Sequence, residues 1–387
     1  MRGHIRRRGR NSWGLKFDLG RDPATGKRQT RYHTVRGAKR AAQAELTRLL
    51  AGSDQGSYVD PSKTTVADFL TRWETDWAPA NVSPKTLERY KELLAQHVRP
   101  HIGASRLQKL KAVDLAGLYG RLQRSKAEGG SGLAPRTVGH VHRLLHRVLG
   151  HAVQWNLIVS NPAASADPPR VQQTTEIEIL APEQIKTVLD ALRGRWIYPI
   201  TILALATGAR RGELCALRWK DVDLDAARVR VERSLEQTNA GLRFKEPKTK
   251  AGRRSISIPP AIVAELRAHW RAQQEQRLAV GAGRAPEDAL VFARPDGEPI
   301  APDTLTQEWA RLVRIMKLPK VTFHALRHTH ASQLIANGLD VVTVSRRLGH
   351  GNPTITLNVY SHLFGNTDER AAAIVEATMS AALLQRE

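Results

Sequence analysis

The sequence has very little cysteine and no long apolar segment. Its one cysteine in 387 residues, Cys215, excludes a framework of internal disulfides and a metal cluster built on cysteines. The neighbours in "GELCALRW" are mostly apolar, so we expect this thiol to be buried. No run of about eighteen apolar residues is present, and "MRGHIRRRGRNSW" carries charge without the apolar core of a signal peptide. We therefore expect a cytoplasmic protein with no membrane partner.

Acidic residues are scarce relative to basic ones. Lys and Arg number 60 against 37 Asp and Glu, which gives a formal net charge of +23 at pH 7. A field of this sign and size favours a polyanionic partner, and nucleic acid fits better than a membrane surface, so we expect the protein on the nucleoid. The hydrophobic fraction of 41% is enough to fill packed cores, and the length favours two or three domains.

Basic residues are concentrated at the beginning of the chain, where residues 1–50 hold fourteen Lys and Arg and three acidic residues. Residues 12–20 and 28–35 alternate as strands around the turn "RDPATGK", and a helix ending at Gly52 follows. We predict that residues 1–55 form a basic β-hairpin backed by a helix, which lays strands in a DNA groove. The alternative is a generic basic arm that grips phosphates.

A second segment, residues 64–160, has a helical pattern and follows the linker-like residues 52–63. Ser83 followed by Pro84 is a typical helix start, and Pro135 opens a further helix. About four such helices would form a small basic bundle. The last helix carries four histidines, which suggest a metal site. No carboxylate or cysteine completes one, so we favour a polar face turned to solvent or phosphate for His140, His142, His146 and His151.

The remaining residues, 174–387, follow a second linker at 160–173 and mix helices with strands. A helix is predicted from Pro182, and "YPITILALATG" predicts an apolar helix after it. The stretches "ARVRVERSLE" and "RRSISIP" alternate as strands, and helices continue to the end. The chain is therefore predicted to be multidomain and mostly α-helical, with an α+β domain at residues 174–387.

Four short stretches of this last domain suggest phosphodiester chemistry: "ATGARRGELCALRW", "FKEPKTKAGRRSISIP", "TFHALRHTHAS" and "LGHGNPTITLNVYSHLFG". Together they supply arginines whose planar forks bind phosphate oxygens, a lysine able to protonate a leaving oxygen, two histidines and a tyrosine. The tyrosine could attack phosphorus if cations or a base overcome its ordinary pKa of about 10. Neither a carboxylate set for two-metal hydrolysis nor a GxxxxGK(S/T) phosphate loop is present, so we expect no metal and no cofactor.

This set resembles the catalytic residues of the tyrosine recombinase, or phage integrase, family, and its order along the chain is the same. The family's Thr-Gly-x-Arg pattern selects Arg210 over Arg211, and its hairpin lysine falls in "PKT". Its His-x-x-Arg and Leu-Gly-His boxes are both present, and its nucleophile is the tyrosine of the last stretch. The matching positions are Arg210, Lys248, His324, Arg327, His350 and Tyr360.

The resemblance implies a role for each position. Arg210, Arg327 and His350 would hold the scissile phosphate, and Tyr360 would attack it to form a 3′-phosphotyrosyl intermediate. Tyr360 lies in a polar stretch, which favours a surface position from which it can reach DNA. Lys248 would be the general acid, and His324 would assist proton transfer. Glu213 resembles the family's supporting acidic position.

The resemblance also implies partners and a biological role. Residues 64–160 resemble a core-site DNA-binding domain, and residues 1–55 resemble the arm-binding domain of larger phage and conjugative-element integrases. We therefore expect an integrase that inserts and excises a mobile element at core and arm attachment sites on double-stranded DNA. The implied assembly is a homotetramer on synapsed DNA, with an excisionase and a host DNA-bending protein as candidate accessory partners.

Other interpretations share part of the pattern. A DNA-binding protein without catalysis would share the charge but would not need the six site residues. An Xer-like recombinase usually lacks the N-terminal arm, and a type IB-like topoisomerase has a similar site but would not need two preceding DNA-binding segments. A zinc hydrolase would use His324, His328 and His330, but no glutamate lies between the helically paired His324 and His328.

Overall fold

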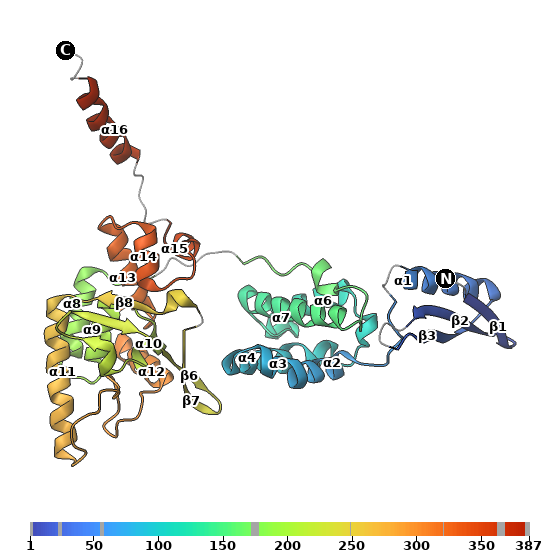
Figure 1. The fold of residues 1–387 in the computed structure, drawn as a ribbon, viewed down its shortest axis with the longest axis horizontal. Helices are drawn as coiled ribbons and strands as arrows, with labels where there is room; N and C mark the ends of the chain where they lie inside the picture. Colours follow the sequence, from blue (N-terminus) through green and yellow to red (C-terminus); the bar gives the residue numbers. More distant parts are fainter. Residues whose placement is uncertain are drawn as a thin grey trace. The chain divides into compact units, whose positions relative to one another are not determined.

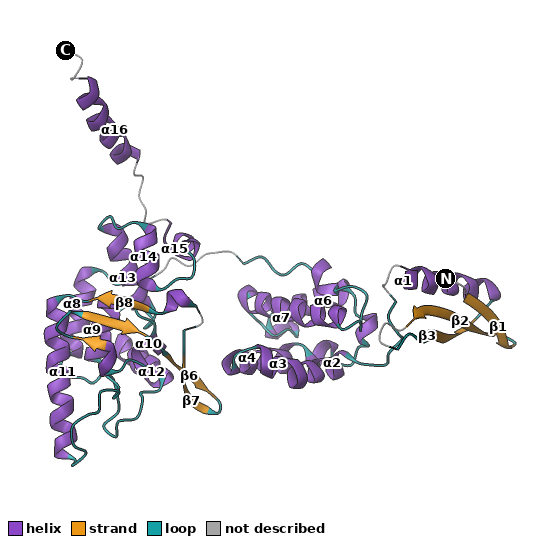
Figure 2. Ribbon diagram, viewed as in Figure 1, coloured by secondary structure: helices purple, strands orange, loops and turns teal. Residues whose placement is uncertain are grey.

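The computed structural model describes residues 3–21, 25–54, 58–171, 178–247, 249–319, 321–361 and 368–383. The chain divides into two compact units, Met1–Gln173 and Thr174–Glu387 (Figure 1). The first holds a small sheet followed by a helical bundle, and the second mixes helices with short strands (Figure 2). The predicted fold class is therefore confirmed. Across the described ranges, no helix combines the length and the apolar character needed to cross a bilayer.

The first unit begins with a three-stranded antiparallel sheet and one helix. The sheet order is β1-β2-β3, and α1 packs on one of its faces. Side chains alternate along β2, so Leu15 and Phe17 face α1 and pack against Leu46 and Leu49. The elements are β1 (Gly3–Gly9), β2 (Ser12–Arg21), β3 (Arg28–Arg36) and α1 (Lys39–Asp54).

The prediction of a two-stranded hairpin was incomplete, because β1 adds a third strand. Its sequence "GHIRRRG" contains one apolar residue, Ile5, so the alternation is too weak to indicate a strand. Pairing with β2 supplies the missing stabilisation: Ile5 lies opposite Leu15 and Arg6 lies opposite Gly14. The helix α1 also continues two residues beyond the predicted end at Gly52.

A helical bundle completes the first unit, and its predicted helix starts are confirmed. Pro84 and Pro135 each occupy the first turn of a helix, where the missing N–H costs no hydrogen bond. Thr65 caps α2 through a reciprocal bond with Asp68. The helices are α2 (Val66–Arg72), a π-helical turn (Trp73–Trp77), α3 (Ala78–Asn81), α4 (Pro84–His97), α5 (Arg99–Ile102), α6 (Ala112–Gln123), α7 (Pro135–Gln154) and 3-10 turns at Leu107–Lys109, Lys126–Glu128 and Pro162–Ser165.

The histidines of α7 do not all share a solvent-facing surface, which corrects the sequence-based expectation. His151 accepts a hydrogen bond from the indole N–H of Trp73 at 2.7 Å, and its ring packs on Trp77. His142 bonds the Tyr119 hydroxyl at 3.1 Å. Both rings therefore pack against aromatic side chains of the bundle core, whereas His140 is exposed and bonds Arg143. The start of the predicted second linker also belongs to the bundle, because Ala163 is buried in its core.

The second unit is built around an apolar helix, α9 (Tyr198–Thr207), with other helices packed against it, and it also contains two small sheets. Three short strands form the sheet β4-β5-β8, and β6 pairs with β7 as a hairpin. The strands are β4 (Val222–Asp223), β5 (Arg228–Val231), β6 (Ser234–Thr238), β7 (Gly241–Lys245) and β8 (Arg254–Ser257). The other helices are α8 (Pro182–Leu192), α10 (Arg211–Cys215), α11 (Pro260–Ala279), α12 (Pro302–Ile315), α13 (Ala325–Ala336), α14 (Val341–Leu348), α15 (Pro353–Tyr360), α16 (Asp368–Leu383) and 3-10 turns at Trp219–Asp221 and Lys250–Gly252.

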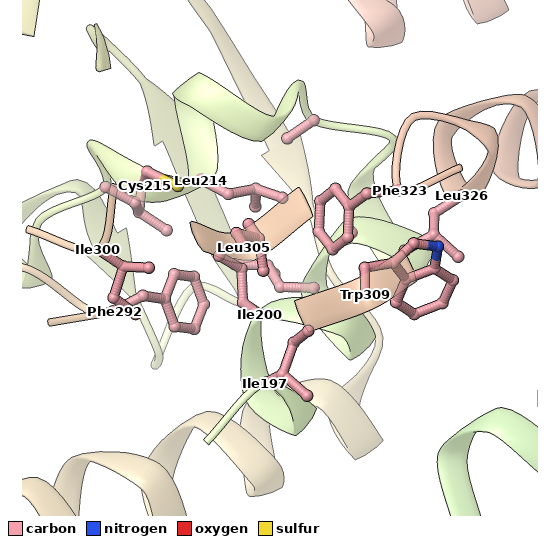
Figure 3. Close-up of a cluster of buried hydrophobic side chains, with 14 of the residues drawn as sticks. Ile197, Ile200, Leu214, Cys215, Phe292, Ile300, Leu305, Trp309, Phe323 and Leu326 are labelled. Carbon is pink, nitrogen blue, oxygen red and sulfur yellow. The ribbon is translucent and has the colours of Figure 1, made fainter. Parts of the chain in front are cut away.

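The core of the second unit joins α9 to α10, α12 and the start of α13 (Figure 3). Trp309 and Phe323 meet edge on with ring centroids 5.7 Å apart. Cys215 is fully buried in this core, as predicted, and burial raises the pKa of its thiol to about 12. This core packs around α9 and the start of α13, two of the elements that carry the site.

Candidate active site

Four of the six predicted site residues line one cavity of about 530 Å³ in the second unit. They are Arg210, His324, Arg327 and His350, and they come from segments up to 140 residues apart in the chain. Lys248 lies outside the described residues, although its neighbours Pro247 and Thr249 line the same cavity. Tyr360 is described but does not line the cavity. The other lining residues include Glu213, Ser234, Lys245, Gly349 and Ile355.

Arg327 is fixed at the floor of the cavity by two backbone carbonyls. Its guanidinium donates to the oxygen of Gly208 at 2.7 Å and to that of Leu348 at 2.8 Å, and the residue is 3% exposed. Burial, followed by the charge of Arg210, lowers the pKa of Arg327 to about 9, so the group remains charged at neutral pH. Each terminal nitrogen of this planar cation thus donates one hydrogen bond to a carbonyl, and three of its five N–H groups remain to bind an anion.

The backbone at Gly208 explains why a glycine precedes the first arginine. Gly208 ends α9 with φ +63, in the left-handed region that favours glycine. A Cβ there would lie 2.7 Å from the His330 ring and 2.8 Å from the Leu348 side chain. The carbonyl that anchors Arg327 therefore depends on a glycine at this turn.

Arg210 is held by a carboxylate that it shares with a second arginine. Glu213 accepts from the Arg210 guanidinium at 2.8 Å and from that of Arg254 at 2.8 Å, and the Glu213 side chain is 5% exposed. Burial raises the pKa of Glu213, but the hydrogen bonds from Arg254 and the charge of Arg210 outweigh it and hold the pKa below its usual range. One carboxylate facing two guanidiniums leaves an excess of positive charge.

Arg210 and Arg211 have different environments, although they are adjacent in the sequence. Arg210 also donates to the carbonyl of Gly349 at 3.1 Å, and it faces the cavity. Arg211 instead donates to the carbonyl of Pro302 at 2.9 Å and pairs with Asp303 at the start of α12. The choice of Arg210 over Arg211 from the Thr-Gly-x-Arg pattern is consistent with these contacts.

The two cavity histidines are uncharged at neutral pH. Burial, followed by the charges of Arg327 and Arg210, lowers the pKa of His350 to about 4. Desolvation, followed by His328 and Arg327, lowers the pKa of His324 to the same value. The Nδ1 atom of His350 bonds the hydroxyl of Thr356, which is fully buried, at 2.8 Å. This contact fixes the ring and leaves Nε2 free to face the cavity.

Tyr360 is buried, which overturns the expectation of a polar surface position. It is 1% exposed and packs in a cluster with Ala331, Ile335, Val344 and Leu348. Its hydroxyl bonds Nδ1 of His328 at 2.7 Å. The sequence "NPTITLNVY" lacks an apolar stripe, but α15 packs beside α13 and α14, and these neighbours supply the apolar surroundings. Burial raises the pKa of Tyr360 to about 12, against the opposing charge of Arg327.

Other side chains of the site were not assigned to it from the sequence. Arg254 and His328 make their contacts with distant segments, which no local pattern indicates, and the sequence offered His328 only as a candidate zinc ligand. Thr356 lies only six residues from His350, but a lone threonine gives no local signal of this contact. The histidines of the zinc alternative also have separate partners, because His330 bonds the carbonyl of Leu205 and accepts from Arg347. Within the described residues, no group of three His, Cys, Asp or Glu is arranged to hold a metal ion.

Known proteins are similar to this chain in both sequence and fold. The phage integrase family model matches residues 178–366, and the N-terminal SAM-like domain of phage integrases matches residues 65–122. The chain is 27% identical to a XerC-like tyrosine recombinase of Caldanaerobacter subterraneus, over 84% of this chain and 86% of the relative. It is 26% identical to the ICEBs1 integrase of Bacillus subtilis, over 92% of this chain and 95% of the relative.

Solved structures agree in fold. The Tn1549 transposon integrase in complex with a circular intermediate DNA superposes with a TM-score of 0.66 at 24% identity, covering 81% of this chain and all of that chain. A lambda integrase tetramer bound to a Holliday junction gives 0.54 at 19% identity, covering 90% and 96%. The chain therefore belongs to the phage integrase family of tyrosine recombinases. It is a site-specific integrase of the kind that mobile elements carry.

Proposed function

We propose that the cavity binds the scissile phosphodiester of DNA and that Tyr360 attacks it to form a 3′-phosphotyrosyl intermediate. The observation that carries this proposal is the convergence of Arg210, His324, Arg327 and His350 on one cavity. Two guanidiniums, of which one is buried on two carbonyls, provide fixed positive charge where the transition state gains negative charge. The neutral histidines add hydrogen bonds without needing a metal.

The general acid for the leaving 5′-oxygen is Lys248. The competing lysine on the same hairpin, Lys245, lines the cavity, but its amine is bound to Glu236 across the β6-β7 pair. An ammonium held in an ion pair is less free to move to a leaving group. Lys248 comes three residues later in the sequence, and its neighbours Pro247 and Thr249 line the cavity. His324 assists proton transfer at the rim.

The hydroxyl of Tyr360, the proposed nucleophile, must move toward the cavity before it can attack a phosphate bound there. The Tyr360 ring is 1% exposed and its hydroxyl faces His328, so a phosphate in the cavity is not yet within its reach. A small movement of the short helix α15, of which Tyr360 is the last residue, would turn the hydroxyl toward the cavity while it stays within hydrogen-bond reach of His328 on α13. We expect DNA binding to drive this shift, because a bound phosphate stabilises the state in which the oxygen meets it.

The first unit supplies the DNA-binding surfaces of the proposed integrase. Residues 1–55 bind arm sites: on the sheet face away from α1, Lys16 lies 5.7 Å from the centre of the Tyr32 ring, and Tyr32 is 68% exposed. Arg6 is exposed on the same face. A basic sheet face of this kind suits a DNA groove. Residues 64–160 bind core sites, and residues 174–387 carry the chemistry.

The proposed assembly is a homotetramer on synapsed attachment sites. The lambda integrase tetramer on a Holliday junction, which shares the fold, supports this assembly. Strand exchange between two duplexes needs one nucleophile for each of four strands, and four copies with one tyrosine each meet that need. An excisionase and a host DNA-bending protein remain candidate accessory partners.

The test of the proposed chemistry compares two neighbouring arginines. Arg210→Lys keeps the charge but loses the planar fork, so cleavage of a nicked attachment site in EDTA should fall by about 10²–10³-fold. Arg211→Lys is the matched control, because Arg211 faces α12, and it should cleave at nearly the wild-type rate. A requirement for a divalent metal, or an equal loss in both variants, would contradict the proposal.

A further inference from the structure

The hydroxyl of Tyr360 has a specific hydrogen-bond partner, the imidazole of His328. His328 lies on α13, one turn beyond His324 and adjacent to Arg327. Its Nδ1 atom is 2.7 Å from the Tyr360 oxygen, with ring centroids 5.7 Å apart. The apolar cluster around Tyr360 holds the tyrosine ring, and this packing fixes the direction in which its hydroxyl meets His328.

Tyr360 needs a proton acceptor to act as a nucleophile. With a pKa raised to about 12, only about one hydroxyl in 10⁵ is ionised at pH 7. The charge of Arg327 favours ionisation but does not outweigh burial. A phenol that attacks phosphorus must therefore lose its proton as the new bond forms, and a base within about 2.6–3.2 Å is the usual solution.

His328 is the best placed of the nearby histidines for this task. His350 has its Nδ1 on Thr356, and both His350 and His324 line the phosphate cavity. His328 contacts the reacting oxygen itself, and its ring meets that of His324 edge on with centroids 5.0 Å apart. Burial, followed by the charge of Arg327, lowers the pKa of His328, so the ring is neutral at pH 7 and Nδ1 can accept a proton.

We propose that His328 is the catalytic proton acceptor for Tyr360, an inference that rests on the proposed function. In cleavage, the Tyr360 oxygen bonds to phosphorus and the bond from phosphorus to the 5′-oxygen breaks. The phenol proton passes to Nδ1 of His328, and the 5′-oxygen takes a proton from the general acid. In resealing, the 5′-hydroxyl attacks, the phosphotyrosyl bond breaks, and the His328 imidazolium returns its proton to Tyr360.

The surroundings of His328 make this transfer dependent on DNA. Among the described residues, the titratable and charged groups that face the ring are His324 and Arg327 on the same helical segment and Tyr360 on α15. Without DNA, the positive charge of Arg327 opposes an imidazolium beside it. A phosphate held by Arg327 neutralises that charge and gains negative charge in the transition state, so it favours protonation of His328. Tyr360 is therefore activated only when its target is bound.

The test uses His328→Asn, because the asparagine amide can occupy the place of Nδ1 and keep a hydrogen bond to Tyr360 but cannot take its proton. We expect single-turnover cleavage of a nicked site at pH 7 to fall by about 10²–10⁴-fold, with DNA affinity unchanged. The wild-type rate should fall as the pH drops through the lowered pKa of His328. In the variant, the rate should instead rise with pH toward the ionisation of the tyrosine itself.

A substrate with sulfur in place of the 5′-bridging oxygen separates the base from the acid. Sulfur needs little protonation, so it should rescue Lys248→Ala but not His328→Asn. Full cleavage by His328→Asn, or faster cleavage by His328→Ala, would overturn the inference and identify the contact as positioning or as a restraint on Tyr360. Absence of a Tyr360 adduct in the wild type would instead overturn the proposed function, so the two failures are distinguishable.

Discussion

At the scale of single residues, the burial of Tyr360 changes what its replacement should do. Tyr360→Phe keeps the ring in its apolar cluster but leaves Nδ1 of His328 without its partner. We expect the free energy of unfolding of the catalytic unit to fall by about 1 kcal/mol, the typical value for one buried hydrogen bond. Urea denaturation measures this change. Tyr360→Ala, which also leaves a cavity, should cost about 3–5 kcal/mol; equal losses in the two variants would contradict the described packing.

Lys248 provides the second prediction at this scale. Lys248→Ala should slow cleavage of an ordinary phosphodiester by about 10²–10⁴-fold, while DNA affinity stays nearly constant because one phosphate contact among many contributes little. Single-turnover cleavage and a binding titration measure the two quantities. Lys245→Ala is the control: it removes an amine bound to Glu236 and should keep most of the activity. If Lys245→Ala shows the larger loss and sulfur at the leaving position restores it, Lys245 is the acid.

At the scale of elements, the ends of α9 and α14 determine the geometry of the site. Each of these helices ends in a glycine with positive φ. The carbonyls at these ends accept hydrogen bonds from the two cavity arginines: those of Gly208 and Leu348 from Arg327, and that of Gly349 from Arg210. Arg254 on β8 links α10 to α14, because its guanidinium donates hydrogen bonds to the carboxylate of Glu213 and to the backbone carbonyl of Arg347. The two cavity arginines are thus positioned by helix ends and buried ion pairs.

The prediction for this scale concerns Gly208. Gly208→Ala should cost more than the about 1–2 kcal/mol of a left-handed alanine, because its Cβ would also meet His330 and Leu348. Displacing the carbonyl under Arg327 should abolish most cleavage. Gly194→Ala is a matched control with φ +77 and nothing within 4 Å of the added Cβ. Thermal unfolding and cleavage assays on both variants measure the difference, and equal behaviour of the two would refute this account of the turn.

These elements also show which features a sequence can predict. Helix starts at Pro84, Pro135 and Pro182 were predictable because a proline at the first turn is a local signal. The four predicted residues that line the cavity lie in short motifs, and a turn such as Thr-Gly-x-Arg carries its geometry within a few residues. The burial of Tyr360 and the strand β1 were not predictable, since both depend on partners that the fold brings from elsewhere.

At the scale of the whole molecule, the charge distribution predicts separable roles for the two ends of the chain. Removing residues 1–60 deletes a strongly basic segment but leaves the bundle core, which begins at Val66, intact. We expect strand cleavage at a core site to persist and recombination between full attachment sites to fall. The salt dependence of DNA binding should also become shallower, because fewer phosphates are neutralised. Full integration by the truncated protein with an unchanged salt slope would exclude the arm-binding role.

The most direct test of the whole account is to identify the residue that becomes linked to DNA. The protein is incubated in EDTA with a nicked attachment site whose short product diffuses away, and the covalent complex is digested and analysed by mass spectrometry. We predict a 3′-phosphotyrosyl link on the peptide that contains Tyr360, and no adduct with Tyr360→Phe. An adduct that persists in the Phe variant, or one that maps to Tyr198 or another tyrosine, would contradict the central claim.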